Sequence, residues 1–157
     1  MLKILKIFSI FFFLVLLASC GYKKINQQTS EINIANVKIN IKNKSAYNLR
    51  NNILLISNNK SENKYNVEIE VSKIKTSKIK NESGKTTRYN ININTIVDFI
   101  SVNNLKTISK TFVGSGDYDV GTGHSETVSN EKNTHETIIQ KISDEITTFI
   151  ALSLNNK

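Results

Sequence analysis

The chain has 157 residues, with 21 lysines and arginines against 13 aspartates and glutamates and a formal net charge of +8. That length suffices for one domain with a hydrophobic core, and no linker rich in proline, glycine or serine divides it. A basic balance can indicate binding to nucleic acid or anionic lipid. Here the excess is lysine, in a sequence saturated with residues encoded by AT-rich codons, and only Arg50 and Arg88 are arginines. Without a helix-turn-helix or RNA-binding motif, this composition gives no support to a nucleic-acid partner.

The first residues have the pattern of an export signal. A short basic end with Lys3 and Lys6 precedes an uncharged apolar run over residues 7–17. A membrane-spanning helix needs about 20 apolar residues, so this shorter run is more typical of a signal peptide that is cleaved after export. We therefore expect residues 1–19 to be a lipoprotein signal peptide.

Cys20 is the only cysteine, which excludes an internal disulfide, and it ends the tetrapeptide Leu-Ala-Ser-Cys at residues 17–20. The tetrapeptide resembles the lipobox of bacterial lipoproteins, whose cysteine receives diacylglycerol and becomes the acylated N-terminus. Several acyl chains, such as palmitate, make a stable anchor where one would be marginal. Gly21 stands where an aspartate would favour the inner membrane in enterobacteria, so we expect a lipid anchor on the periplasmic side of the cell outer membrane. The alternatives are a buried Cys20 or an uncleaved anchor.

After a polar tether over residues 20–30, the domain begins with an alternating pattern. Apolar residues alternate with polar ones over residues 32–41, with one slip at Ala35-Asn36, which predicts a bulged strand. Spacings of three and four over residues 46–56 predict an amphipathic helix, with Ser45 as its N-cap and Asn58-Asn59 as its end.

Three further strands are predicted. Alternation over residues 65–71, weakening near Ile74, predicts a strand with one buried face. A polar turn over residues 75–85 leads to a long strand over residues 89–99, and Asn103-Asn104 turns the chain again. A last strand covers residues 106–113.

A glycine-containing loop over residues 114–123 precedes the last predicted element, a long helix. Its apolar stripe should cover one face of the sheet, and its members are His135, Ile138, Ile139, Ile142, Ile146, Phe149 and Ile150. The order strand-helix-strand-strand-strand-helix predicts a single α+β domain over residues 31–157. We expect a two-layer sandwich, with two helices packed on a mainly antiparallel four-stranded sheet.

The residues that could support chemistry do not form a recognised site. His124 and His135 do not make a metal-ligand pair such as H-x-x-x-H. Asp117 and Asp119 flank Tyr118, and in an extended strand their spacing would place both on one face. They could be paired carboxylates, but solvated turn carboxylates are the plainer explanation, and the loop matches no phosphate-binding motif. No nucleophile motif is present. We expect no enzyme, no cofactor and no metal site.

The lipobox, the Cys20-Gly21-Tyr22 start, the element order and the size of the mature chain together resemble the LPS-assembly lipoprotein family (LptE-like). The more specific part of the resemblance is a tyrosine in an extended stretch, then small polar residues, then a helix with small and aliphatic positions. In this sequence these are Tyr118, Ser125, Ser129, the segment Glu131-Asn133-Glu136, and Ile138, Ile142, Ile146 and Ile150.

The resemblance implies a non-catalytic role in lipopolysaccharide transport. Members sit inside the barrel of the outer-membrane translocon subunit (LptD-like), help that barrel assemble, and contact lipopolysaccharide. The phosphates of lipid A call for cations, and Lys85 with Arg88 are the ligand-binding residues we select, because arginine holds phosphate with a planar fork. The alternatives are an exposed turn without ligand, a periplasm-facing lipoprotein that binds a small ligand or cell-wall polymer, and an exported hydrolase.

Overall fold

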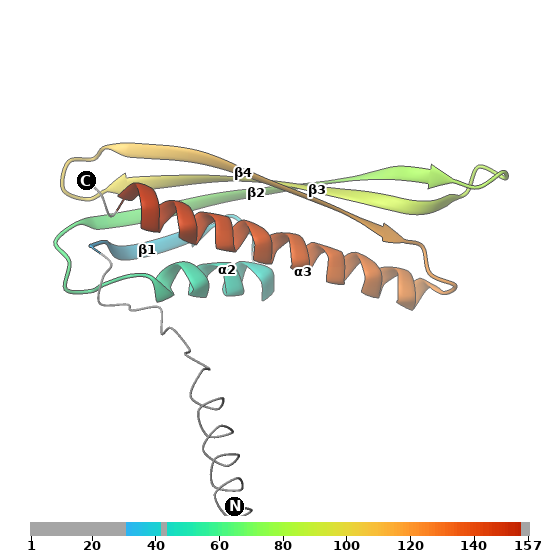
Figure 1. The fold of residues 1–157 in the computed structure, drawn as a ribbon, viewed down its shortest axis with the longest axis horizontal. Coiled ribbons are helices and arrows are strands. Elements are labelled where there is room, and N and C mark those ends of the chain that lie inside the picture. Colours follow the sequence, from blue (N-terminus) through green and yellow to red (C-terminus); the bar gives the residue numbers. More distant parts are fainter. Residues whose placement is uncertain (1–30, 42–43, 155–157) are drawn as a thin grey trace, which may run out of the picture.

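The computed structural model describes residues 31–41 and 44–154. In this part of the chain the strands form one sheet in the order β1-β2-β3-β4, and two helices cover the same face of it (Figure 1). The predicted α+β two-layer sandwich and its element order are confirmed. The elements are β1 (Asn33–Ile39), α2 (Lys44–Leu55), β2 (Lys64–Lys80), β3 (Thr86–Ser101), β4 (Thr107–Asp119), α3 (His124–Phe149) and a π-helical end η2 (Ile150–Leu154).

The sheet is mainly antiparallel, as predicted, with one parallel pair. β1 is parallel to β2, whereas β2–β3 and β3–β4 are antiparallel. A parallel pair needs a crossover connection, which α2 supplies. The predicted bulge is present between Ile34 and Asn36. It lets Ile34 and Val37, which are an odd number of residues apart, both be buried.

Helix α2 forms where the spacing predicts it, but its start differs from our prediction. Ala46, Leu49 and Ile53 are buried, as expected. Ser45 is not the N-cap, because the helix already includes Lys44 and Ser45 is a buried residue of its first turn. The Ser45 hydroxyl lies 3.5 Å from Nδ1 of His135 in α3, so this side chain joins the two helices.

The β2–β3 hairpin is longer than predicted. The expected turn over residues 75–85 is wrong in its first half, because β2 pairs with β3 as far as Lys80 and Thr86. Beyond Val71 every residue of β2 is exposed. Because this part of the strand has no buried face, its sequence shows no alternation of apolar and polar residues, although its pairing with β3 continues. The end of the hairpin projects past both helices (Figure 1).

Strand β4 is also longer than predicted and contains two glycines of the expected loop. It runs to Asp119, so that Gly114 and Gly116 lie inside the strand. A Cβ on Gly114 would lie 2.5 Å from Cγ2 of Ile138, and one on Gly116 would lie 2.9 Å from Cγ2 of Thr134. These glycines therefore permit the close approach of α3 to β4, and the connection between them is only the short segment 120–123.

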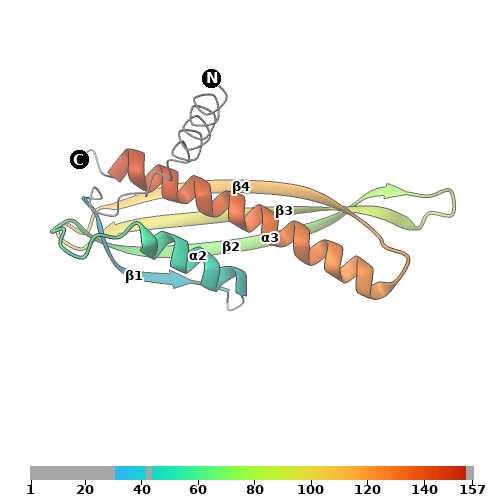
Figure 2. The same cartoon turned by 60° about the horizontal axis from the view of Figure 1, so that its bottom comes forward.

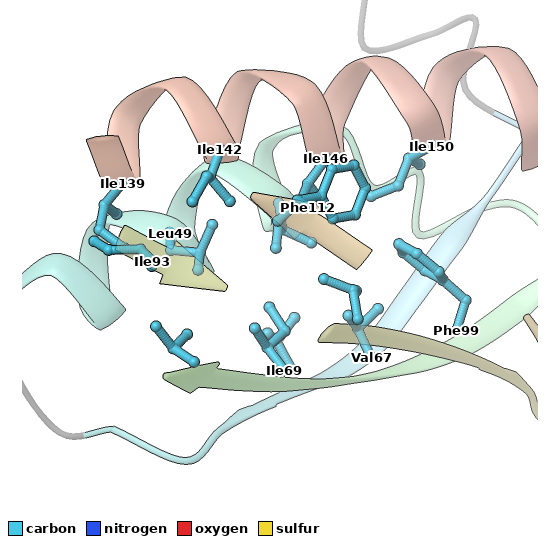
Figure 3. Packing of buried hydrophobic residues seen from close by; sticks show 14 of the residues in the cluster. Leu49, Val67, Ile69, Ile93, Phe99, Phe112, Ile139, Ile142, Ile146 and Ile150 are labelled. Atoms are coloured by element: carbon cyan, nitrogen blue, oxygen red, sulfur yellow. The ribbon is translucent and has the colours of Figure 1, made fainter. Parts of the chain in front are cut away.

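The core lies between the sheet and the two helices (Figures 2 and 3). The isoleucine stripe of α3 faces it as predicted, since Ile138, Ile139, Ile142 and Ile146 are buried. At the end of the helix Phe149 packs on side chains of both β3 and β4, because its ring centroid is 5.6 Å from that of Phe99 and 6.1 Å from that of Phe112. Within the described ranges, no helix is long and apolar enough to cross a membrane.

Candidate binding surface

The proposed lipidation site lies outside the described residues. Cys20 and the tether over residues 20–30 precede Glu31, where the description begins, so lipidation of Cys20 stays a prediction. The surface that the structure does describe is the projecting end of the β2–β3 hairpin, with the strand and helix residues that support it.

The hairpin ends in an ordered turn. Asn81 closes it: its backbone N–H donates to the carbonyl of Lys85 at 2.9 Å, and its side-chain oxygen accepts from the Lys85 N–H at 2.9 Å and from the Ser83 hydroxyl at 2.8 Å. Gly84 has φ of +79°, a conformation that glycine adopts without a steric penalty. The turn therefore holds Lys85 at the tip of the hairpin.

The two ligand-binding residues chosen from the sequence have different surroundings. Lys85 is exposed in the turn. Arg88 lies on β3 opposite Asp119, and its fork donates Nε to Oδ1 at 2.6 Å and Nη2 to Oδ2 at 3.0 Å. This pair lowers the pKa of Asp119 and raises that of Arg88. The Arg88 fork is therefore already engaged by a carboxylate.

Asp117 and Asp119 share one face of β4, as their spacing predicts, but they lie in the strand and not in a turn. Asp117 pairs with Lys78 and accepts a hydrogen bond from Asn90 Nδ2 at 2.7 Å. Both interactions, the one with Lys78 first, lower the pKa of Asp117. The ion pairs of Asp117 with Lys78 and of Asp119 with Arg88 connect β4 to β2 and β3. The two carboxylates therefore have a structural role.

A polar cluster on the helix-facing side of the sheet could not be recognised from the sequence. We call Lys73, Lys75, Tyr89, Tyr118 and Glu131 the Glu131 cluster. The Glu131 carboxylate accepts from Lys73 Nζ at 2.7 Å, from Lys75 Nζ at 2.7 Å and from the Tyr118 hydroxyl at 2.8 Å. Lys75 Nζ also lies 4.4 Å from the Tyr89 ring centroid, a favourable cation–π distance. The tyrosine rings stack at 5.6 Å.

These contacts shift the ionisation of the Glu131 cluster. The two lysines, Lys73 first, lower the pKa of Glu131 to about 2. Its carboxylate in turn raises the pKa of Lys75, whereas burial raises the pKa of Tyr118. The sequence contains only a weak indication of this cluster. Lys73 and Lys75 follow Val67, Ile69 and Val71 at the same two-residue spacing, so they share the helix-facing side of β2 although they are charged.

The histidines do not make a metal site with each other. His124 begins α3 and is exposed, whereas His135 is half-buried near Ser45. Burial lowers the pKa of His135 below its ordinary value of 6.5, so the neutral ring is favoured. Among the residues that the structure describes, no three histidine, cysteine, aspartate or glutamate side chains are grouped to hold a metal ion.

Comparisons with known proteins relate the fold to that of bacterial lipoproteins. No family model matches the chain, and no curated protein sequence matches it. The structure is similar to rare lipoprotein B from Shewanella oneidensis, with a TM-score of 0.61 and 8% identity over 77% of this chain and 97% of that one. It is also similar to a protein described as a lipoprotein from Caulobacter crescentus, with a TM-score of 0.53 and 12% identity over 82% of this chain and 93% of that one. At these identities the likeness establishes a shared fold.

Proposed function

We propose that this chain is an outer-membrane lipoprotein that acts as plug and assembly partner of the β-barrel (LptD-like) that exports lipopolysaccharide. The observation that carries the proposal is the β2–β3 hairpin, whose end projects beyond both helices and whose β2 residues beyond Val71 are exposed on both faces. The fold shared with rare lipoprotein B supports it. Such a protein works through its surface, and the proposal needs no catalytic residue, cofactor or metal.

The uncovered face of the sheet suits the hydrated wall of a barrel lumen. Asn90, Asn92 and Asn94 follow one another on this face of the central strand β3. Asn90 and Asn92 are already joined by a hydrogen bond of 3.0 Å, which leaves further amide donors and acceptors for a partner. A lipid anchor at Cys20 would hold the domain at the inner leaflet, from which the sandwich enters the barrel.

Lipopolysaccharide contact is the second part of the proposal, at Lys85 and Arg88. Lys85 is exposed at the tip and can approach a phosphate without losing an ion pair. Arg88 has to exchange the Asp119 carboxylate for a phosphate oxygen, which keeps the bidentate geometry of its fork. The site therefore binds phosphate by competition with a carboxylate of the same sheet.

The test of the proposal is depletion of the chain, combined with recovery of its partners. A C-terminally tagged chain in mild detergent should co-purify a large β-barrel, identified by mass spectrometry. Depletion should lower surface lipopolysaccharide and correctly assembled barrel together. Normal levels of both after depletion would contradict the proposal.

The glycolipid site has its own test. Exchanging both Lys85 and Arg88 for glutamine should weaken binding of purified lipopolysaccharide by the whole chain. Arg50→Gln, at the only other arginine and on helix α2, is the control and should bind normally. Equal binding by the two variants would remove the assigned site and leave the role as a plug open.

A polar pocket favours a second candidate, binding of a small ligand or cell-wall polymer. The pocket has a volume of about 210 Å³ and lies at the other end of the sheet. Asparagine amides suit the hydroxyl groups of a sugar, and the lining includes Asn63, Tyr65, Ser101, Asn103, Asn104 and Lys106. Co-purification of a barrel separates this candidate from the first.

A further inference from the structure

The free edge of β4 is the long, regular edge of the sheet. β4 has 13 residues and pairs with β3 from Thr107 to Asp119 without a register shift. Its other side has no neighbouring strand among the residues described here. Such an edge presents a row of unpaired N–H and C=O groups to another extended chain.

The opposite edge of the sheet is less available. β1 has only 7 residues, and the bulge between Ile34 and Asn36 interrupts its ladder. Short strands and bulges are two of the features that keep edge strands from pairing with other chains. On β4 there are two comparable features. One is the cation Lys110, whose Nζ lies 5.9 Å from the Phe149 ring centroid. The other is at the end of the strand, where Asn130 Nδ2 of α3 donates to the Asp119 carbonyl at 3.1 Å and Thr134 Oγ1 to the Asp117 carbonyl at 3.5 Å, so the available part of the edge is the earlier part of β4.

A groove runs beside the middle of β4, between this strand and α3. It has a volume of about 570 Å³. Its floor contains Phe112 from the strand and the half-buried Phe149 from the helix. A strand edge beside an apolar groove is the arrangement used in peptide recognition by strand addition, where the backbone gives affinity and a pocket takes alternate side chains.

We propose that an extended, uncharged segment of a partner protein docks on β4 as a fifth strand, with one apolar side chain in the groove over Phe112 and Phe149. The charges around the groove favour an uncharged segment. Lys110 and Lys141 stand beside Asp144 and Glu145 on its lining, so that the two signs balance and neither end attracts a charged peptide. The proposal goes beyond the role as a plug and uses neither the hairpin tip nor the lipid anchor.

The position of α3 argues for a lone segment over a second copy of this chain. Helix α3 packs on β4 itself, since a Cβ at Gly114 or Gly116 would lie 2.5 or 2.9 Å from its side chains. Two copies paired through β4 about a two-fold axis would bring both α3 helices to the same side of the joint sheet, so the two helices would have to pack against each other. A segment without a covering helix needs no such packing.

The proposal can be tested with a defined peptide and the whole chain labelled with nitrogen-15 in mild detergent. The probe is a peptide of about eight alternating threonines and valines with blocked ends, which is within the usual length of a strand. It should shift the amide resonances of residues 110–113 and 141–149. The same peptide with an N-methyl group on every residue has no N–H donors for the ladder and should leave them unchanged.

A matched pair of variants locates the site. Val113 and Ile74 lie on the uncovered face of the sheet and are 61% and 62% exposed. A lysine on the edge strand should oppose pairing, so Val113→Lys should weaken peptide binding at least about tenfold, while Ile74→Lys on β2 should not. Resonances away from β4 report whether each variant is folded.

Three results would overturn the proposal. One is equal peptide affinity of Val113→Lys and the unaltered chain. Another is an equal response to the N-methylated peptide, which cannot extend the ladder. The third is a dimer of the chain, linked through β4 in the absence of peptide, because it would assign the edge to a second copy.

Discussion

Glu131 is the residue that joins the long hairpin to the helix layer. It is in α3, yet its carboxylate holds Lys73 and Lys75 of β2 and Tyr118 of β4. Its side chain is 25% exposed, and those of Lys73 and Lys75 are 39% and 37% exposed, so water screens these contacts in part. The two ion pairs form a network on one carboxylate, and a network contributes more than an isolated surface pair.

Glu131 should make the domain sensitive to acid. Its pKa falls from 4.5 to about 2 on folding, so its contribution is present above pH 4.5 and is lost as the pH falls towards 2. The size of the shift sets an upper limit of about 3 kcal/mol on this contribution, and screening of the partly exposed lysines by water makes it smaller. Glu131→Gln should lower the free energy of unfolding near neutral pH and flatten its fall over this range, as measured by urea unfolding at several pH values.

Glu145→Gln is the control for this prediction, because Glu145 is exposed on the same helix. It should keep the acid dependence of the unaltered chain. An undiminished loss of stability between pH 4.5 and pH 2 in Glu131→Gln would show that other groups cause it.

At the scale of elements, α3 supplies the helix stripe that closes the core over the sheet. Ile142 and Ile146 are fully buried, and their neighbours come from β3, β4 and α2 (Figure 3). A buried isoleucine reduced to alanine typically costs about 2 to 5 kcal/mol. Ile142→Ala should lower the free energy of unfolding by this amount in denaturant melts. Val128→Ala, on a side chain that is 50% exposed, should change it little, and similar losses in both would place the stripe outside the core.

The contact of α3 with β4 depends on a strand residue without a side chain. Alanine at Gly114 would place its Cβ 2.5 Å from Ile138 Cγ2 and 3.3 Å from Ile142 Cδ1. Overpacking of this kind costs about 1 to 3 kcal/mol, so Gly114→Ala should lower the melting temperature. Ser115→Ala, at an exposed position of the same strand, is the control. A Gly114→Ala protein as stable as the control would mean that α3 can shift away from the sheet.

The whole molecule is a packed sandwich along most of its length, and the end of the β2–β3 hairpin projects beyond the helices (Figures 1 and 2). The sandwich keeps the domain folded, while the projecting end exposes its side chains on both faces. The proposed role as a plug rests on this exposed end.

Attachment to the membrane is predicted to depend on Cys20. Cys20→Ala removes the only thiol, so it should abolish labelling by an alkyne fatty acid in cells, and the chain should lose its lipid anchor. Lys23→Ala, in the tether close to the cysteine, should be labelled normally. Labelling that persists in Cys20→Ala would contradict lipidation at this residue.

The sequence by itself determined the helix and sheet layers, because an element that is buried on one face has apolar residues at a regular spacing. The bulge at Ala35-Asn36, the spacing of α2 and the isoleucine stripe of α3 all follow from which side chains meet the core. The same rule explains the errors. Beyond Val71 both faces of β2 are exposed to solvent, so the strand continues without a periodic pattern of apolar residues.

Only the tertiary structure decided what the polar and small residues do. From the sequence, Gly114 and Gly116 are predicted to lie in a loop, whereas in the structure they lie in β4 directly beneath α3. The sequence gives Arg88 no partner, whereas in the structure it pairs with Asp119 on the neighbouring strand. The Glu131 cluster gathers residues from three strands and a helix, and such contacts leave no local pattern. The role of a charged residue or a glycine depends on its neighbours in space, whereas the periodicity of apolar residues can be recognised in the sequence itself.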